Sequence, residues 1–167
     1  MRPISVALVL FSLAVAFGTS ATAQSVTTTS PRQPTQVVFV CEHGSVKSLV
    51  AMEHFNRRAE ERGLPYRAVA RGTAPEPGVP ESVRSGLRAD GFEFSGFVPQ
   101  LLTASDVNDA SLVVSFDQDI ASIVGSRVRH LKWDNLPGVL ADYARARDAI
   151  VSQIDALVDA LARGDSP

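Results

Sequence analysis

The sequence lacks residues on which several classes of protein depend. It contains one cysteine in 167 residues, which excludes an internal disulfide and any mechanism that needs a second cysteine of the same chain. It has no run of basic residues, no alternation of basic and aromatic residues, and a formal net charge of −2. Nucleic-acid binding, which needs a concentrated positive surface, is therefore not expected. No internal repeat is visible, and the length suits one domain.

The N-terminal segment has the pattern of a signal peptide. Arg2 precedes an apolar stretch over residues 4–17 that is short for a membrane span, and Ala21-Thr22-Ala23 forms an A-x-A cleavage site. We therefore expect a signal peptide over residues 1–23 and a mature chain that begins at Gln24. The competing interpretation is an uncleaved N-terminal anchor.

Export has consequences for the rest of the chain. A signal peptide predicts a periplasmic or secreted protein with no stable membrane span after cleavage. A lone thiol is exposed to oxidation in such compartments.

Residues 24–36 are rich in Ser, Thr and Pro without periodicity and predict a flexible linker.

The remaining pattern predicts an α/β domain over residues 37–163. Short apolar runs typical of buried strands lie at residues 37–40, 66–70, 112–116 and, more weakly, 128–131. Helical patterns lie at residues 46–61, 80–90, 103–109, 117–123 and 139–161. Strands that alternate with helices predict a four-stranded parallel sheet with helices on both faces. Ligands of such sheets bind beyond the carboxyl ends of the strands.

The end of the first apolar run carries the strongest functional signal. The run ends in Cys41, a small polar loop follows, and a helical pattern then begins with Lys47 and Ser48 in its first turn. Backbone N–H groups of such a loop and of the helix N-terminus converge on one point, where the helix dipole favours an anion. A cysteine at the mouth of this loop is in the setting of a nucleophile.

The spacing Cys41, five residues, Lys47, Ser48 resembles the low-molecular-weight protein tyrosine phosphatases and the related thioredoxin-coupled arsenate reductases. Their signature is Cys, five residues, Arg, Ser after the first strand. Arg71-Gly72-Thr73 resembles the Ala-Gly-Thr turn of the family, and Trp133 falls where the family has a Trp shortly before its catalytic Asp-Pro. The resemblance covers about residues 36–161 and implies the phosphotyrosine protein phosphatase I-like three-layer fold.

The resemblance implies phosphate-monoester hydrolysis without a cofactor or a metal. Cys41 would be the nucleophile that forms a cysteinyl phosphate, Ser48 would donate to its sulfur, Asp134 would be the general acid and Trp133 would lie at the substrate rim. Lys47 would stabilise the oxyanion, together with the amides of the loop residues Glu42, His43, Gly44, Ser45 and Val46. The implied partner is a phosphorylated small molecule or a phosphotyrosine protein. No feature of the sequence indicates an oligomeric state.

The chain departs from the family in three places. Lys47 stands where the family has Arg. A lysine ammonium carries the charge but lacks the planar guanidinium that can bind two oxygens at once. We therefore expect a loss on the order of 2–4 kcal/mol of transition-state stabilisation. His43-Gly44 replaces Gly-Asn, so that Gly44 is expected to take over a position with positive φ. Leu136 rather than Asp precedes Pro137. This leaves Asp117 and Asp119 as fallback acids.

Other interpretations stay open. A non-catalytic oxyanion-binding protein on the same scaffold fits the Lys47 exchange, and arsenate reduction is possible only with an external thiol. Cys41 and His43 with His54 or His130 would make an incomplete metal site. Cys41 could also be a buried structural thiol, and His54 is expected to be an exposed helical residue.

Overall fold

The computed structural model describes residues 33–93, 95–126 and 128–165. The expected signal peptide and the expected linker up to residue 32 lie outside these residues. In the part of the chain that is described, no helix combines the length and the hydropathy needed to cross a bilayer.

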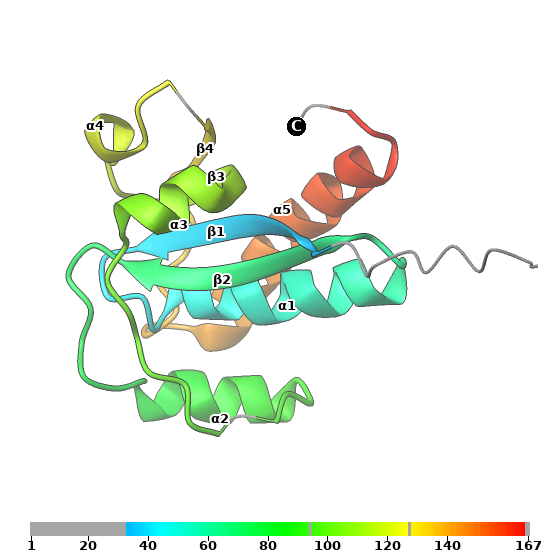
Figure 1. The fold of residues 1–167 in the computed structure, drawn as a ribbon. Coiled ribbons are helices and arrows are strands. Elements are labelled where there is room, and N and C mark those ends of the chain that lie inside the picture. Colours follow the sequence, from blue (N-terminus) through cyan, green and yellow to red (C-terminus); the bar gives the residue numbers. More distant parts are fainter. Residues whose placement is uncertain (1–32, 94, 127, 166–167) are drawn as a thin grey trace, which may run out of the picture. The chain divides into compact units, whose positions relative to one another are not determined.

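Four parallel strands form one sheet in the order β2-β1-β3-β4 (Figure 1). The strands are β1 (Thr35–Cys41), β2 (Tyr66–Gly72), β3 (Ala110–Phe116) and β4 (Arg129–Trp133). This arrangement confirms the predicted sheet. β1 and β3 occupy its centre, and the apolar residues 37–40 are fully buried because helices cover both faces. β1 begins two residues earlier than expected, within the predicted linker.

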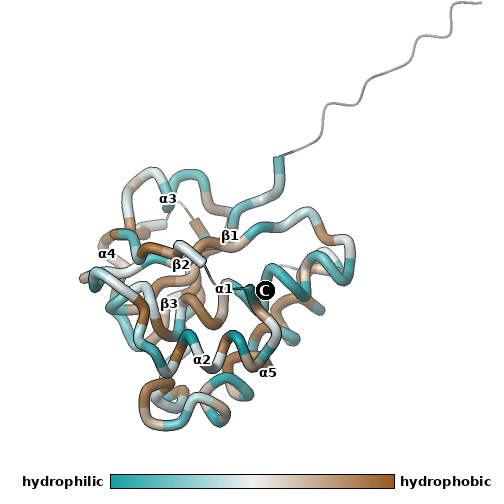
Figure 2. Tube along the Cα trace, turned by 90° about the horizontal axis from the view of Figure 1, so that it is seen from below, coloured by the Kyte–Doolittle hydropathy of each residue, from teal (hydrophilic) through white to brown (hydrophobic). Residues whose placement is uncertain are grey.

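The helices are α1 (Lys47–Glu61), α2 (Glu81–Ala89), α3 (Ala104–Asp109), α4 (Ala121–Val124) and α5 (Tyr143–Ala162). The side chains of alternate residues of β1 point to opposite faces of the sheet. Val37 and Phe39 pack with residues of α1, α2 and α5, whereas Val38 and Val40 pack with residues of α3 and α4. Hydrophilic and hydrophobic residues alternate along α1 and α5, as expected for helices with one buried face (Figure 2).

Three of the boundaries that differ from the expected ones lie near the carboxyl edge of the sheet. The expected helix over residues 117–123 is reduced to α4, because Asp117 has a φ of 52° and cannot start a right-handed helix. β4 extends to Trp133, which was expected in a loop. α5 begins at Tyr143 rather than at residue 139, because the Asp142 side chain caps it by accepting from the Arg145 N–H.

These differences lengthen two connections. Residues 117–120 follow β3 and residues 134–142 follow β4, and neither segment is helical. Both connections emerge at the carboxyl end of the sheet, beside the loop that follows β1 (Figure 1).

Candidate active site

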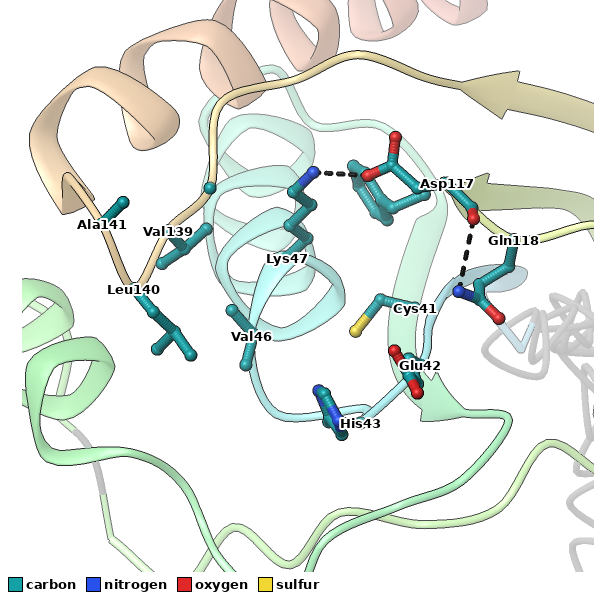
Figure 3. A pocket seen from close by; sticks show the side chains of 12 residues that line it. Cys41, Glu42, His43, Val46, Lys47, Asp117, Gln118, Val139, Leu140 and Ala141 are labelled. Atoms are coloured by element: carbon teal, nitrogen blue, oxygen red, sulfur yellow. Dashed lines mark hydrogen bonds and ion pairs between the residues drawn. The ribbon is translucent and has the colours of Figure 1, made fainter.

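A pocket of about 350 Å³ opens where the loops after β1, β3 and β4 meet (Figure 3). Its lining is formed by Cys41, Glu42, His43, Val46, Lys47, Phe116, Asp117, Gln118, Gly138, Val139, Leu140 and Ala141. This is the position at which parallel α/β sheets bind ligands.

Cys41 lies at the last position of β1 and its side chain lines the pocket (Figure 3). Its Sγ atom lies 3.1 Å from the Oγ atom of Ser48, which is fully buried in the first turn of α1. A thiolate at Cys41 can accept a hydrogen bond from this hydroxyl. The arrangement brings together two of the residues that the sequence predicted.

The loop between Cys41 and α1 is shaped by a close approach to the turn after β2. Gly44 has a φ of 70°, as expected for the residue that takes over the left-handed position. A Cβ atom on Gly72 would lie 2.9 Å from the Gly44 nitrogen, so only glycine fits there. The Thr73 N–H donates to the Cys41 carbonyl at 3.1 Å, and the Ala74 N–H donates to the Glu42 carbonyl at 2.8 Å. The 71–74 turn therefore holds the loop in place.

The N-terminus of α1 faces this loop without a capping side chain. Val46 precedes the helix and supplies no side-chain acceptor, and the first turn contains no acidic residue. The first N–H groups of a helix need an acceptor from outside the helix. An anion held by the loop could supply it.

Lys47 joins the two lengthened connections. Its Nζ atom lies 2.5 Å from Oδ2 of Asp117 and donates to the Leu136 carbonyl at 2.9 Å. The second carboxylate oxygen of Asp117, Oδ1, accepts the Asn135 N–H at 3.0 Å. The Lys47 side chain is 15% exposed and that of Asp117 is 44% exposed, so the ion pair lies at the open side of the pocket.

Two predicted site residues lie elsewhere. Trp133 belongs to the end of β4 and packs against the rings of Phe39 and Phe116, with centroid distances of 5.9 and 5.6 Å. It therefore lies behind the pocket wall and not at its rim. Asp134 is exposed, pairs with Lys132 at 3.3 Å and does not line the pocket. Both expectations depended on β4 ending before residue 132, and its actual length moves both residues.

The other predicted loop residues have separate surroundings. Glu42 is exposed at the pocket edge. His43 Nε2 lies 3.4 Å from Oε1 of Glu76. Ser45 is fully buried, and its Oγ atom has no hydrogen-bond partner among the described residues.

The sequence missed two parts of the pocket. Gln118 lines it and accepts a hydrogen bond from the Thr73 hydroxyl at 3.3 Å. Val139, Leu140 and Ala141 form an apolar wall, in which Leu140 is 59% exposed. These wall residues were expected in a helix over residues 139–161. The signal that could have corrected this expectation is Asp142, a typical N-cap residue that lies four positions after Gly138 and three positions after the expected helix start at residue 139.

The remaining histidines are bound to other side chains. His54 is 9% exposed, and not exposed as expected, because its ring packs against Phe92 and its Nε2 atom lies 3.3 Å from Oδ2 of Asp90. Burial lowers the pKa of His54 and outweighs the opposing effect of Asp90. His130 Nε2 lies 2.8 Å from the Ser115 hydroxyl. No three metal-ligating side chains cluster within residues 33–93, 95–126 and 128–165.

Comparisons with known proteins agree with this architecture. The profile of the low molecular weight phosphotyrosine protein phosphatase family matches residues 36–149. No curated protein matches the chain. Among solved structures, YfkJ from Bacillus subtilis superposes with a TM-score of 0.70 at 15% identity and covers 81% of this chain and 99% of its own.

Two further structures have the same fold. A low molecular weight protein tyrosine phosphatase from T. tengcongensis gives a TM-score of 0.67 at 18% identity, over 75% of this chain and 98% of its own. A thioredoxin-dependent arsenate reductase from Corynebacterium glutamicum gives a TM-score of 0.60 at 18% identity, over 81% of this chain and 63% of its own. At these identities the likeness concerns the fold.

Proposed function

The chain belongs to the low molecular weight phosphotyrosine protein phosphatase family, and we propose that it hydrolyses phosphate monoesters through a cysteinyl phosphate formed on Cys41. The observation that carries the proposal is the position of the Cys41 sulfur. It lines a pocket at the uncapped N-terminus of α1, 3.1 Å from the hydroxyl of Ser48. This combines a nucleophile and an oxyanion site in one place.

The reaction follows from these groups. The Cys41 thiolate attacks phosphorus, so that an S–P bond forms while the P–O bond to the leaving group breaks. The N–H groups of the loop and the Lys47 ammonium stabilise the charge on the phosphoryl oxygens. The leaving oxygen takes up a proton and departs as an alcohol or phenol. Water then attacks the cysteinyl phosphate and gives up a proton, the S–P bond breaks with its electron pair on sulfur, and inorganic phosphate is released. The Ser48 hydroxyl stabilises the departing thiolate.

Turnover of an aryl phosphate by the reduced protein tests the proposal. Cys41→Ser should lower the rate by about three decades or more, because the nucleophile of a covalent mechanism cannot be bypassed efficiently. A matched control is Ser105→Ala, which replaces an exposed serine on α3 whose hydroxyl donates a hydrogen bond to Asp109. Absence of turnover in the unaltered protein, or full activity of Cys41→Ser, would refute the proposed function.

A second candidate is an oxyanion-binding protein without turnover. The observation that favours it is that the Lys47 ammonium contacts Asp117 and the Leu136 carbonyl. This candidate predicts phosphate binding in calorimetry with no hydrolysis of any aryl phosphate. Loss of both binding and turnover would remove it together with the first.

Arsenate reduction is the remaining candidate from the sequence. Cys41 is the only cysteine of the chain, so the electrons would have to come from an external thiol. Oxidation of an added thiol that depends on both arsenate and Cys41 would support this activity.

We also infer that the protein acts outside the cytoplasm on a phosphorylated small molecule or protein. The pattern of residues 1–23 supports export, and Gln24 would then be the first residue of the mature chain. Mass spectrometry of the protein recovered from its native host would test this. A chain that retains residue 1 would contradict cleavage.

A further inference from the structure

The Lys47–Asp117 ion pair places a carboxylate at the open side of the pocket that contains the Cys41 thiol. Asp117 follows β3, which lies beside β1 in the sheet. The Lys47 ammonium and the Asp117 carboxylate are in contact, and both residues line the pocket together with Cys41 (Figure 3). The inference below depends on the proposed phosphatase function and concerns the source of the proton for the leaving group.

The two oxygens of Asp117 are held differently. Oδ1 accepts the Asn135 N–H at 3.0 Å, and Oδ2 contacts the Lys47 ammonium at 2.5 Å. Asp117 also has a φ of 52°, a conformation that is uncommon for residues other than glycine and that is concentrated at functional sites. If Lys47 leaves, the contact with Asn135 keeps the carboxyl group in place while Oδ2 becomes free.

A phosphate at the loop competes with Asp117 for Lys47. A phosphate dianion carries more negative charge than one carboxylate, and the N–H groups at the start of α1 hold it within reach of the ammonium. Lys47 contacts two acceptors, Asp117 and the Leu136 carbonyl, and its third donor can turn toward the anion. The carboxylate that loses Lys47 then lies beside an anion, and a proton from solvent on its Oδ2 atom removes the repulsion between the two charges.

We propose that Asp117 is the general acid of the reaction and that the bound oxyanion releases it by taking Lys47 from it. As the Cys41 sulfur attacks phosphorus, the proton on Oδ2 of Asp117 moves to the leaving oxygen, and the P–O bond breaks. In the second step Asp117 accepts a proton from the attacking water as the S–P bond breaks. The Lys47–Asp117 pair re-forms when the phosphate leaves.

The other carboxylates near the site are less suited. Asp134 lies outside the pocket and pairs with Lys132. Asp119 accepts the Ala121 N–H at 3.2 Å and does not line the pocket. Glu42 lines the pocket but belongs to the loop that binds the anion. Asp117 differs from these three residues in two respects. It lines the pocket from the connection after β3, outside the loop that binds the anion, and its carboxylate contacts Lys47.

The dependence on the leaving group distinguishes an acid from a structural residue. Asp117→Asn should lose about 10²-fold or more in kcat/KM with phenyl phosphate, whose leaving oxygen needs a proton, and only about fivefold with 2,4-dinitrophenyl phosphate. Asparagine tolerates the same backbone conformation, so the variant should fold, and its thermal melt checks this. Asp134→Asn is the comparison and should stay within about twofold on both esters. Equal losses on both esters in Asp117→Asn, or a selective loss in Asp134→Asn, would overturn the assignment.

Binding of inorganic phosphate gives a readout that is independent of turnover. Asp117→Asn should bind phosphate about tenfold more tightly in calorimetry, because Lys47 no longer has to leave a carboxylate. A purely structural role would predict weaker binding, which would refute the exchange. Tighter phosphate binding by Asp117→Asn, with no turnover by the unaltered protein, would support the exchange of Lys47 between Asp117 and the anion. It would refute the proposed phosphatase function. Turnover by the unaltered protein, together with the same leaving-group dependence in Asp117→Asn, would support the proposed phosphatase function and refute Asp117 as the general acid.

Discussion

Lys47 stands where the sequence resemblance to the family implies an Arg. Its ammonium reaches Asp117 and the Leu136 carbonyl, and both contacts need only a point charge. A phosphoryl group in the transition state presents two equatorial oxygens that a guanidinium can bind in a bidentate way. In the proposed reaction, Lys47 therefore attracts the phosphoryl group by its charge but cannot bind two of its oxygens at once, so it lowers the activation barrier less than Arg would.

Lys47→Arg should increase the rate of aryl phosphate hydrolysis by about 10²-fold, because it adds a second charge-assisted hydrogen bond in the transition state. Steady-state kinetics on one ester measures this. Lys132→Arg is the control, since Lys132 pairs with the exposed Asp134 and does not line the pocket. A rate that stays within twofold would mean that another step limits turnover.

Gly72 tests how strictly the loop is held. A Cβ atom there would lie 2.9 Å from backbone atoms of residues 42–44, and backbone cannot yield as a flexible side chain can. Gly72→Ala should therefore destabilise the domain by about 1–3 kcal/mol and weaken phosphate binding. Urea unfolding and calorimetry measure the two effects. Gly78→Ala is the matched control, because no atom lies within 4 Å of its Cβ position. Equal behaviour of both variants would contradict the close approach.

The sequence predicts single residues where spacing along one loop is sufficient. Cys41, Lys47 and Ser48 lie within one strand-loop-helix unit, so their proximity does not depend on any distant element. Asp117 and Asp134 follow other strands, and their positions depend on the residue at which those strands end. An error of two residues at the end of β4 was enough to misplace Asp134.

At the scale of elements, α1, α5 and the end of α2 are joined by a buried polar cluster. Asp90 accepts hydrogen bonds from the Tyr143 hydroxyl at 2.7 Å and from Arg147. Its other neighbour is His54, and the Arg57 side chain donates to the Asp90 carbonyl at 2.9 Å. Burial and the Asp90 carboxylate raise the pKa of Tyr143 above its ordinary value, so this hydroxyl stays protonated. The cluster attaches three helices to one another on the same face of the sheet.

His54 makes this cluster sensitive to acid. Its pKa in the folded protein lies below the ordinary value of 6.5 because burial disfavours the charged ring, and the positive charges of Arg57 and Arg147 act in the same direction. The unfolded chain therefore binds a proton that the folded chain does not, and stability falls as the pH drops below 6.5.

His54→Gln should flatten this fall. Urea unfolding between pH 7 and pH 5 should show a difference in slope between the unaltered protein and the variant of up to about 1.4 kcal/mol per pH unit. His130, whose pKa is also lowered by burial, is present in both proteins and does not contribute to the difference. Parallel stability curves would show that His54 titrates alike in the folded and unfolded chains.

The types and order of elements follow from the sequence, but several of their ends do not. Thr103 and Asp106 form the capping box that starts α3, and such a local signal is legible in sequence. The start of α5 is different, because residues 139–141 are apolar and extend the helical pattern. Their contribution to the pocket wall becomes visible only once the domain is assembled.

At the scale of the whole domain, the alternation of strands and helices predicts a parallel sheet with both faces covered. It does not specify which connections meet over the first strand. The order β2-β1-β3-β4 puts β3 beside β1, and this neighbour relation brings the connection after β3 to the Cys41 loop. The site is thus a property of sheet order and cannot be read from any single motif.

Because the pocket joins three connections, a bound oxyanion should stabilise the domain as a unit. Phosphate at about 100 times its dissociation constant would add about 2.7 kcal/mol to the free energy of unfolding, which raises Tm by about 10 °C. Thermal melts of the unaltered protein and of Lys47→Met at matched ionic strength measure this. Phosphate also stabilises proteins through general exclusion from their surface, and that part should be the same in both. The specific increase should be larger in the unaltered protein. Identical increases in the two proteins would mean that Lys47 takes no part in binding the anion.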